Sequence, residues 1–357
     1  MSNTIGEKIR VTVFGQSHAP SIGAVIEGLP AGMKIDMERV KAFMARRAPG
    51  QNALSTARKE ADDPKIIAGL NEWGETCGAP VCMIIENSDQ RSKDYSKLRE
   101  FPRPGHADYT AAVKFGGAND IRGGGQFSGR MTAPICFAGA VCMQLLEKKG
   151  VRIGAHIASI ADADDERFVL PDEEILDLIE SHAFPVIDEA AGERMQKRIL
   201  EAKAEGDSVG GVIEVCALNV PAGLGDPMFD GMENSLARAA FGIPAVRGVE
   251  FGTGFAAARM KGSEHNDPFY MKADGTVASK TNHHGGILGG ITSGMPIVMR
   301  VAIKPTPSIA KEQETVSLVK KADDRLTIEG RHDPCIVHRA VPCLESIMAI
   351  AIADKMV

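Results

Sequence analysis

The chain has 357 residues, of which 44% are hydrophobic and 25% charged, and its formal net charge is −6. This composition supports a packed core and excludes a disordered protein, and the acidic balance argues against a general nucleic-acid binder. The length allows one large domain or two ordinary ones.

The seven cysteines are mostly found in apolar runs, which is typical of reduced core thiols in a cytosolic protein. There is no CxxC pair, so we expect no metal site of the structural zinc type. The N-terminus lacks a basic-then-apolar signal, and no apolar run approaches the roughly 20 residues of a membrane span. We therefore expect a soluble, cytoplasmic protein.

Strands and helices are predicted in mixed order along the whole chain. Strands are predicted over residues 8–14, 22–26, 65–69, 80–86, 151–160, 209–218, 247–251 and 296–304. Helices are predicted over residues 36–47, 133–147, 172–182, 188–204, 232–241 and 341–356. Because no repeat or linker marks a boundary, the sequence predicts an α/β (α+β) fold in a single domain over residues 1–357.

Two early segments carry candidate functional residues. Ser17 and His18 follow the first predicted strand beside a glycine, where a histidine either projects into a cleft or lies exposed in a turn. The local residues leave both interpretations open. Arg47 lies in the last turn of the helix over residues 36–47, where the default explanation of an arginine is its interaction with the helix dipole.

The most informative stretch is residues 101–134, FPRPGHADYTAAVKFGGANDIRGGGQFSGRMTAP. Its many glycines predict a loop rather than a helix, and its length is typical of a binding loop. Arg103, Arg130 and His106 are its candidate functional residues. Arginines grip anions in pairs, and an imidazole transfers protons near neutral pH. The stretch therefore predicts an anion-binding loop.

Three later loops add glycines and cations. Residues 282–294, NHHGGILGGITSG, contain His283 and His284, but neighbouring residues on an extended chain point apart, so we expect no metal there. The segment 304–308, KPTPS, offers a lysine and two hydroxyl groups to a phosphate. Charged residues also follow Gly330 in the sequence RHDPC. If these loops converge with those around Arg47 and residues 103–130, they form a pocket for a small polyanion.

The sequence resembles the chorismate synthase family over essentially its whole length. The resemblance is carried by FGQSHAPSIGAVIEGLPAG, RRAPG, NSDQRSKDYS, RPGHADYT, RGGGQFSGRMTA, NHHGGILGGITSGMPI, KPTPSI and GRHDPCIVHRAVP, in the family's order. It implies a single-domain β-α-β sandwich that assembles as a homotetramer. It also implies 1,4-anti elimination of phosphate from 5-enolpyruvylshikimate 3-phosphate, giving chorismate, with reduced FMN required although no net redox change occurs.

The resemblance also implies roles for individual residues. His106 would protonate the departing phosphate, His18 would protonate or orient the flavin, and Asp333 would assist deprotonation. The substrate-binding residues implied by the resemblance are Ser17, Arg47, Arg103, Arg130 and Arg339. The FMN-binding residues implied by it are Ser128, Ala245, Gly289, Lys304, Pro305, Thr306, Pro307, Ser308 and Arg331.

The chain departs from the family pattern at several positions. Gln16 and Ala19 replace an acid and a glycine, and Gln126 and Phe127 replace an arginine and a serine. A further arginine of the family pattern is missing, because Ala53 or Leu54 occupies its position. The alternative hypothesis is therefore a homologue that binds flavin or polyanions without turnover. No large insertion suggests an added reductase activity, so an external flavin reductase or reductant is expected rather than NADPH (NADP) as the direct source of electrons.

Overall fold

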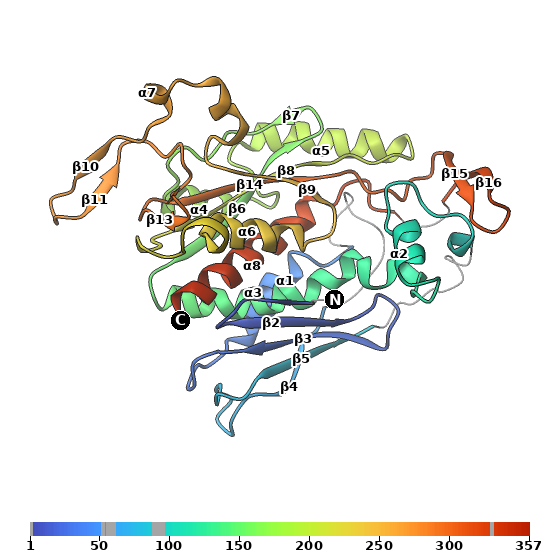
Figure 1. The fold of residues 1–357 in the computed structure, drawn as a ribbon, viewed down its shortest axis with the longest axis horizontal. Helices are drawn as coiled ribbons and strands as arrows, with labels where there is room; N and C mark the ends of the chain where they lie inside the picture. Colours follow the sequence, from blue (N-terminus) through green and yellow to red (C-terminus); the bar gives the residue numbers. More distant parts are fainter. Residues whose placement is uncertain (1–2, 51–53, 55–61, 88–96, 329–331) are drawn as a thin grey trace.

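The computed structural model describes residues 3–50, 54, 62–87, 97–328 and 332–357, and these form two sheets with helices between them (Figure 1). The first sheet is antiparallel, with the strand order β1 (Thr4–Ile5), β2 (Arg10–Gly15), β3 (Ser21–Glu27), β5 (Val81–Glu86) and β4 (Lys65–Ala68). The second is also antiparallel, with the order β7 (Ala163–Asp164), β6 (Arg152–Ile160), β8 (Gly211–Leu218), β14 (Ile297–Ile303) and β9 (Val246–Phe251).

The middle layer is built around two long helices, α3 (Thr132–Glu147) and α8 (Val337–Met356). Helix α3 packs on the first sheet and α8 on the second (Figure 1). Gly139 lets the two helices cross closely, because a side chain there would overlap Ser346. The shorter helices α1 (Met37–Ala45) and α6 (Met232–Phe241) complete this layer. The α/β fold and the β-α-β layering predicted from the sequence are confirmed.

The outer face of the second sheet is covered by α4 (Glu173–Ser181) and α5 (Glu189–Ala204). Three hairpins extend from the body: β10 (Phe269–Met271) with β11 (Val277–Ser279), β12 (Ile287–Leu288) with β13 (Ile291–Thr292), and β15 (Gln313–Ser317) with β16 (Ala322–Leu326). The sequence reading placed no strand in these hairpins. Their strands have two to five residues, too short for a period of two to be visible.

One boundary prediction was wrong. Helix α8 begins four residues earlier than the predicted 341, and Pro342 lies within it. Pro342 is the sixth residue of α8, beyond the first turn in which proline is favoured, so the helix lacks the hydrogen bond that this position would donate to the carbonyl of His338. Residues 129–147 are also long and apolar enough to cross a membrane, although the sequence reading found no such run. Because 83% of that window is buried inside the protein, it is the core helix of the middle layer.

A buried charged network lies on the second sheet. The His156 ring bridges Asp165 Oδ2 and Glu214 Oε2, both at 3.1 Å, and all three side chains are almost fully buried. Burial alone would lower the pKa of His156, but the hydrogen bonds to Asp165 and Glu214 outweigh it and raise that pKa above its usual value.

This network predicts a pH dependence of stability. A raised pKa in the folded state stabilises the protein fully below the unfolded pKa of about 6.5, and the contribution is lost as pH rises through the folded pKa. The free energy of unfolding should therefore fall with rising pH, by at most about 1.4 kcal/mol per pH unit from this group. Urea denaturation at a series of pH values from about 6.5 upward measures this dependence. His156→Gln should lose the slope of unfolding free energy against pH, and His182→Gln should keep it. An unchanged slope in His156→Gln would refute the assignment.

Candidate active site

The glycine-rich stretch is more structured than its composition predicts. It contains a helix, α2 (Asp108–Lys114), and a 3-10 turn over residues 122–127. The expectation that glycines prevent a helix here was wrong, because none of the seven residues of α2 is glycine and the glycines lie on either side of it.

The turn Gly123-Gly124-Gly125 lies between the two candidate catalytic histidines. All three residues have positive φ angles of 59°, 82° and 55°. A Cβ on Gly123 would lie 2.5 Å from both His18 Nδ1 and Ser17 Oγ, and one on Gly124 would lie 3.3 Å from His106 Nε2. Glycine is required here because the backbone itself separates the two imidazoles.

Substituting Gly123 by alanine should therefore displace the His18 ring or distort the turn. We expect Gly123→Ala to lower turnover at least tenfold. A rise of about 1.4 kcal/mol in the activation free energy is enough for this, and the positive φ adds backbone strain in the alanine variant. Gly262, on the exposed helix α7 (Gly262–His265), is the matched control, because a Cβ there meets nothing within 4 Å and its φ is not positive. Steady-state kinetics of both variants decide the matter: equal rates for Gly123→Ala and the native protein would contradict this geometry.

His106 is held by a buried carboxylate. Its Nδ1 lies 2.6 Å from Asp108 Oδ1, and Arg103 Nε donates to Asp108 Oδ2 at 2.7 Å. Burial opposes ionisation of Asp108, but the hydrogen bonds from Arg103 and His106 hold its pKa below its usual range. An ionised Asp108 accepts the Nδ1 proton, which leaves Nε2 of His106 as the nitrogen beside the glycine turn.

A second buried carboxylate joins two of the predicted substrate arginines. Asp62 Oδ2 accepts from Arg47 Nε at 2.9 Å, and Oδ1 accepts from Arg130 Nη1. The exposed fractions of these side chains are only 2% to 4%. Burial opposes the charge of Arg47, but the carboxylate of Asp62 outweighs it and raises the pKa of Arg47. Asp62 therefore fixes both guanidinium groups in place.

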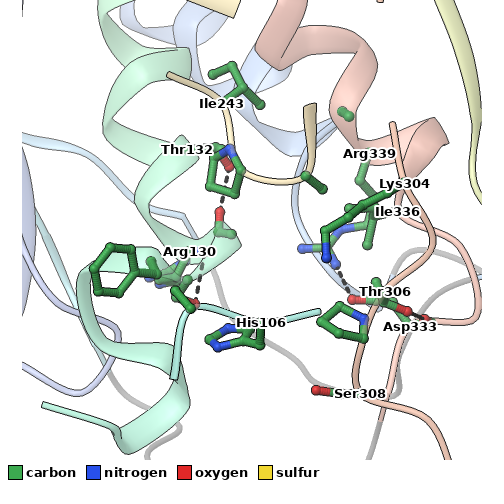
Figure 2. Close-up of a pocket in the computed structure, with 18 of the residues that line it drawn as sticks. His106, Arg130, Thr132, Ile243, Lys304, Thr306, Ser308, Asp333, Ile336 and Arg339 are labelled. Atoms are coloured by element: carbon green, nitrogen blue, oxygen red, sulfur yellow. Dashed lines mark hydrogen bonds and ion pairs between the residues drawn. The ribbon is translucent and has the colours of Figure 1, made fainter. Parts of the chain in front are cut away.

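Asp333 and Arg339 lie across the cavity from His106 (Figure 2). Arg339 Nη1 donates to Asp333 Oδ2 at 2.7 Å, and Arg339 Nε donates to the carbonyl of Arg47 at 2.9 Å. Thr306 Oγ1 donates to the carbonyl of Asp333 at 2.7 Å, so the 304–308 segment is tied to this pair. Lys304 Nζ donates to the carbonyl of Gly105 at 2.6 Å, which joins the segment to the His106 loop.

These groups surround one cavity of about 580 Å³ (Figure 2). Among the described residues, the cationic side chains of Arg47, Arg103, Arg130, Lys304 and Arg339 outnumber the carboxylates of Asp62, Asp108 and Asp333, which pair with the four arginines. Part of the wall is apolar, with Phe127, Phe241, Ile243, Pro244 and Ile336. The excess positive charge suits a ligand with several negative charges, and the apolar wall suits a ring system.

Most of the residues predicted from the sequence meet here. The cavity wall includes His106, Arg47, Arg103, Arg130, Arg339, Asp333, Ser128, Ala245, Lys304, Thr306, Pro307 and Ser308. Pro305 lies between two wall residues of the same segment. Ser17 and His18 are buried behind Gly123 rather than in the wall, with exposed fractions of 2% and 3%.

Other predicted residues lie elsewhere. Gly289 lies in the turn between β12 and β13 and is not part of the cavity wall. Arg331 and Ala53 lie outside the described residues, and Leu54 is buried in the core. His283 and His284 lie near the base of the β10–β11 arm, where they hydrogen-bond Thr253 and Asp267. No group of three metal-binding side chains occurs among the residues that the structure describes.

Sequence reasoning missed the two carboxylates that position the site. Asp108 is two residues after His106, and this spacing beside an arginine was a usable signal. Asp62 had no comparable signal, because it lies 15 residues from Arg47 and 68 from Arg130 along the chain. A buried acid within a cationic cavity becomes evident only from the folded structure.

The fold and the cavity together define an α/β enzyme that acts on a small polyanion. The family model of chorismate synthase matches residues 9–357. Curated relatives named chorismate synthase are 49% identical in Korarchaeum cryptofilum, over 98% of this chain and 96% of that protein, and 42% identical in Lancefieldella parvula, over 100% and 96%. The chain belongs to the chorismate synthase family.

A solved structure supports the same conclusion. A crystal structure of chorismate synthase superimposes with a TM-score of 0.76 at 28% sequence identity, covering 98% of this chain and 92% of that one. The chain is therefore a phosphate lyase of the shikimate pathway that forms chorismate from 5-enolpyruvylshikimate 3-phosphate.

Proposed function

We propose that the elimination takes place in the cavity between the N-terminal ends of α3 and α8, with His106 as the acid that protonates the leaving phosphate. The observation that carries this proposal is the His106–Asp108 pair beside four arginines in one cavity. The buried carboxylate of Asp108 sets the orientation of the imidazole, and the excess cations would stabilise the charge of the departing phosphate.

The four arginines occupy three places around the cavity. Arg103 lies on the His106 side, where Nη2 donates to Asp108 Oδ1 at 2.9 Å. Arg47 and Arg130 are joined through Asp62, and Arg339 lies across the cavity. A substrate with one phosphate and two carboxylates needs separated cationic contacts, so these groups would bind opposite ends of it. Ser17 Oγ is buried and has no hydrogen-bond partner within the described part of the chain, so it is a further candidate contact beside Gly123.

The cavity also fits a reduced FMN. The aromatic side chains of Phe127 and Phe241 lie in its wall, and both are partly exposed. Lys304, Thr306 and Ser308 supply an ammonium group and two hydroxyl groups for a phosphate. We propose that these three, with Ser128, Ala245, Pro305, Pro307 and Arg331, hold the cofactor. The bound group supplies transient electron donation to the allylic phosphate.

The remaining proton positions follow from the same geometry. Asp333 is the carboxylate across from His106, so we assign it to assisting removal of the substrate proton. The hydrogen bond from Arg339 holds the Asp333 carboxylate in place at the cavity wall. His18 is assigned to protonating or orienting the reduced flavin, from its position behind the Gly123 backbone. Gly289 stays a prediction from the family resemblance, because its turn is not in the wall.

One assay tests the proposal. Purified protein is mixed anaerobically with photoreduced FMN and 5-enolpyruvylshikimate 3-phosphate, and phosphate release and chorismate absorbance are followed together. Equal amounts of both products are expected. Binding of both ligands without product would favour the alternative of a binding homologue, which Gln126 and Phe127 in the cavity wall motivate.

Assembly and supply of electrons extend the proposal. We propose a single domain over residues 1–357, a homotetramer, a cytoplasmic location and an external flavin reductase or reductant. Light scattering of the purified protein tests the tetramer. Turnover driven by NADPH alone, with oxidised FMN and no added reductase, would contradict the external reductant.

A further inference from the structure

We propose that Cys343 and Cys136 form a dithiol in the floor of the substrate cavity, which hydrogen peroxide converts into a disulfide. Cys343 lies in the cavity wall, on α8. Cys136 faces it from α3, and the two sulfur atoms are 3.8 Å apart. Both cysteines are otherwise buried and reduced, and neither takes part in the assigned chemistry.

The helix packing gives this pair its short separation. Gly139 and Ser346 lie three residues beyond Cys136 and Cys343 on their helices, and a side chain on Gly139 would overlap Ser346. Because the helices approach closely at Gly139 and Ser346, the two cysteines one turn earlier on each helix also come close to each other. A disulfide needs a sulfur–sulfur distance of about 2.05 Å, which rotation of the two side chains can supply more readily than movement of the helices.

The surroundings of Cys343 favour its thiolate. The hydrogen bond from the Cys136 thiol lowers the pKa of Cys343 against the effect of burial, and the charges of Arg47 and Arg339 lower it further. The same burial, with Cys343 as neighbour, raises the pKa of Cys136. Cys343 is therefore the sulfur that reacts and Cys136 the one that resolves, because the thiolate is the nucleophile.

The reaction balances with peroxide as the two-electron oxidant. The Cys343 thiolate attacks one oxygen of hydrogen peroxide, the O–O bond breaks, and sulfenic acid and hydroxide form. The Cys136 thiol then attacks the sulfenic sulfur, the S–O bond breaks, and a disulfide and water form. Peroxide is small enough to enter a cavity of about 580 Å³ that opens beside Cys343.

The test counts thiols in the full-length protein. Reduced protein is exposed to graded hydrogen peroxide, then alkylated with N-ethylmaleimide in denaturant and weighed. We expect alkylation of two of the seven cysteines to be lost, with a cross-linked peptide that contains Cys136 and Cys343 and that dithiothreitol cleaves. Inorganic phosphate should slow the loss, because it binds the arginines that stabilise the thiolate.

Three variants complete the design. Cys142→Ser should still form the bond, since Cys142 is buried on the same helix without a thiol partner in contact. Cys343→Ser should abolish it. Cys136→Ser should leave a sulfenic acid on Cys343 that dimedone labels. A bond that still forms in Cys343→Ser, a cross-link between other cysteines, or Cys136→Ser protein without dimedone on Cys343 would overturn the proposal.

Discussion

Replacing His106 by alanine is expected to lower kcat by about 10²- to 10⁴-fold while KM changes little. The imidazole is the acid proposed to protonate the leaving phosphate, whereas the four arginines are the groups proposed to bind the substrate. Loss of proton transfer therefore affects the transition state more than the ground state. Single-turnover phosphate release, with photoreduced FMN and saturating substrate, measures the effect directly.

Three further variants test the His106–Asp108 pair. Asp108→Asn keeps the shape of the side chain but removes the carboxylate that accepts from Nδ1 of His106, so kcat should fall. It also removes the buried carboxylate that pairs with Arg103, so the melting temperature should fall as well, and kcat is measured well below it. The double variant should be no slower than His106→Ala, because the pair acts as a unit. His182→Ala, outside the cavity wall, should keep full activity. A His106→Ala protein with undiminished turnover would remove this residue from the mechanism.

The fold was largely predictable because its long elements carry clear patterns. Helix α3 was placed to within one residue of its observed start and at its observed end, because a long apolar run covers its whole length. Strand β14 was likewise placed within one residue at each end. Short elements were missed for a physical reason. Helix α2 has seven residues, about two turns, between glycines, and Asp108 in its first turn is held by Arg103 and His106, which no local pattern shows.

The cavity shows a similar division. Its cations were visible in sequence because arginine, lysine and histidine near glycines and prolines are unusual away from a ligand. The carboxylates were not visible, because an acid that positions a cation carries no local signature. Asp108 and Asp62 each bridge two functional side chains. Asp62 joins Arg47, which is 15 positions away in the sequence, to Arg130, which is 68 positions away. Such pairing depends on the tertiary fold and therefore escapes any local pattern.

Substituting Asp62 by asparagine is expected to cost the ligand-free protein about 3–5 kcal/mol of unfolding free energy. The amide keeps the shape but removes the buried carboxylate charge that pairs with both Arg47 and Arg130. Glu147→Gln is the matched control, because its bidentate pair with Arg39 is about half exposed and surface pairs contribute only about 0–1 kcal/mol. Urea denaturation of both variants gives the comparison.

The same variant distinguishes a structural acid from one that belongs to the anion site. If Arg47 and Arg130 bind the substrate's anionic groups, an added anion can replace the lost carboxylate as their counter-ion. Inorganic phosphate should then stabilise Asp62→Asn more than the native protein, whereas it should act equally on Glu147→Gln and the native protein. Equal phosphate stabilisation in all three would mean that these two guanidinium groups serve the fold alone, and the substrate's anionic groups would have to bind Arg103, Lys304 and Arg339 instead.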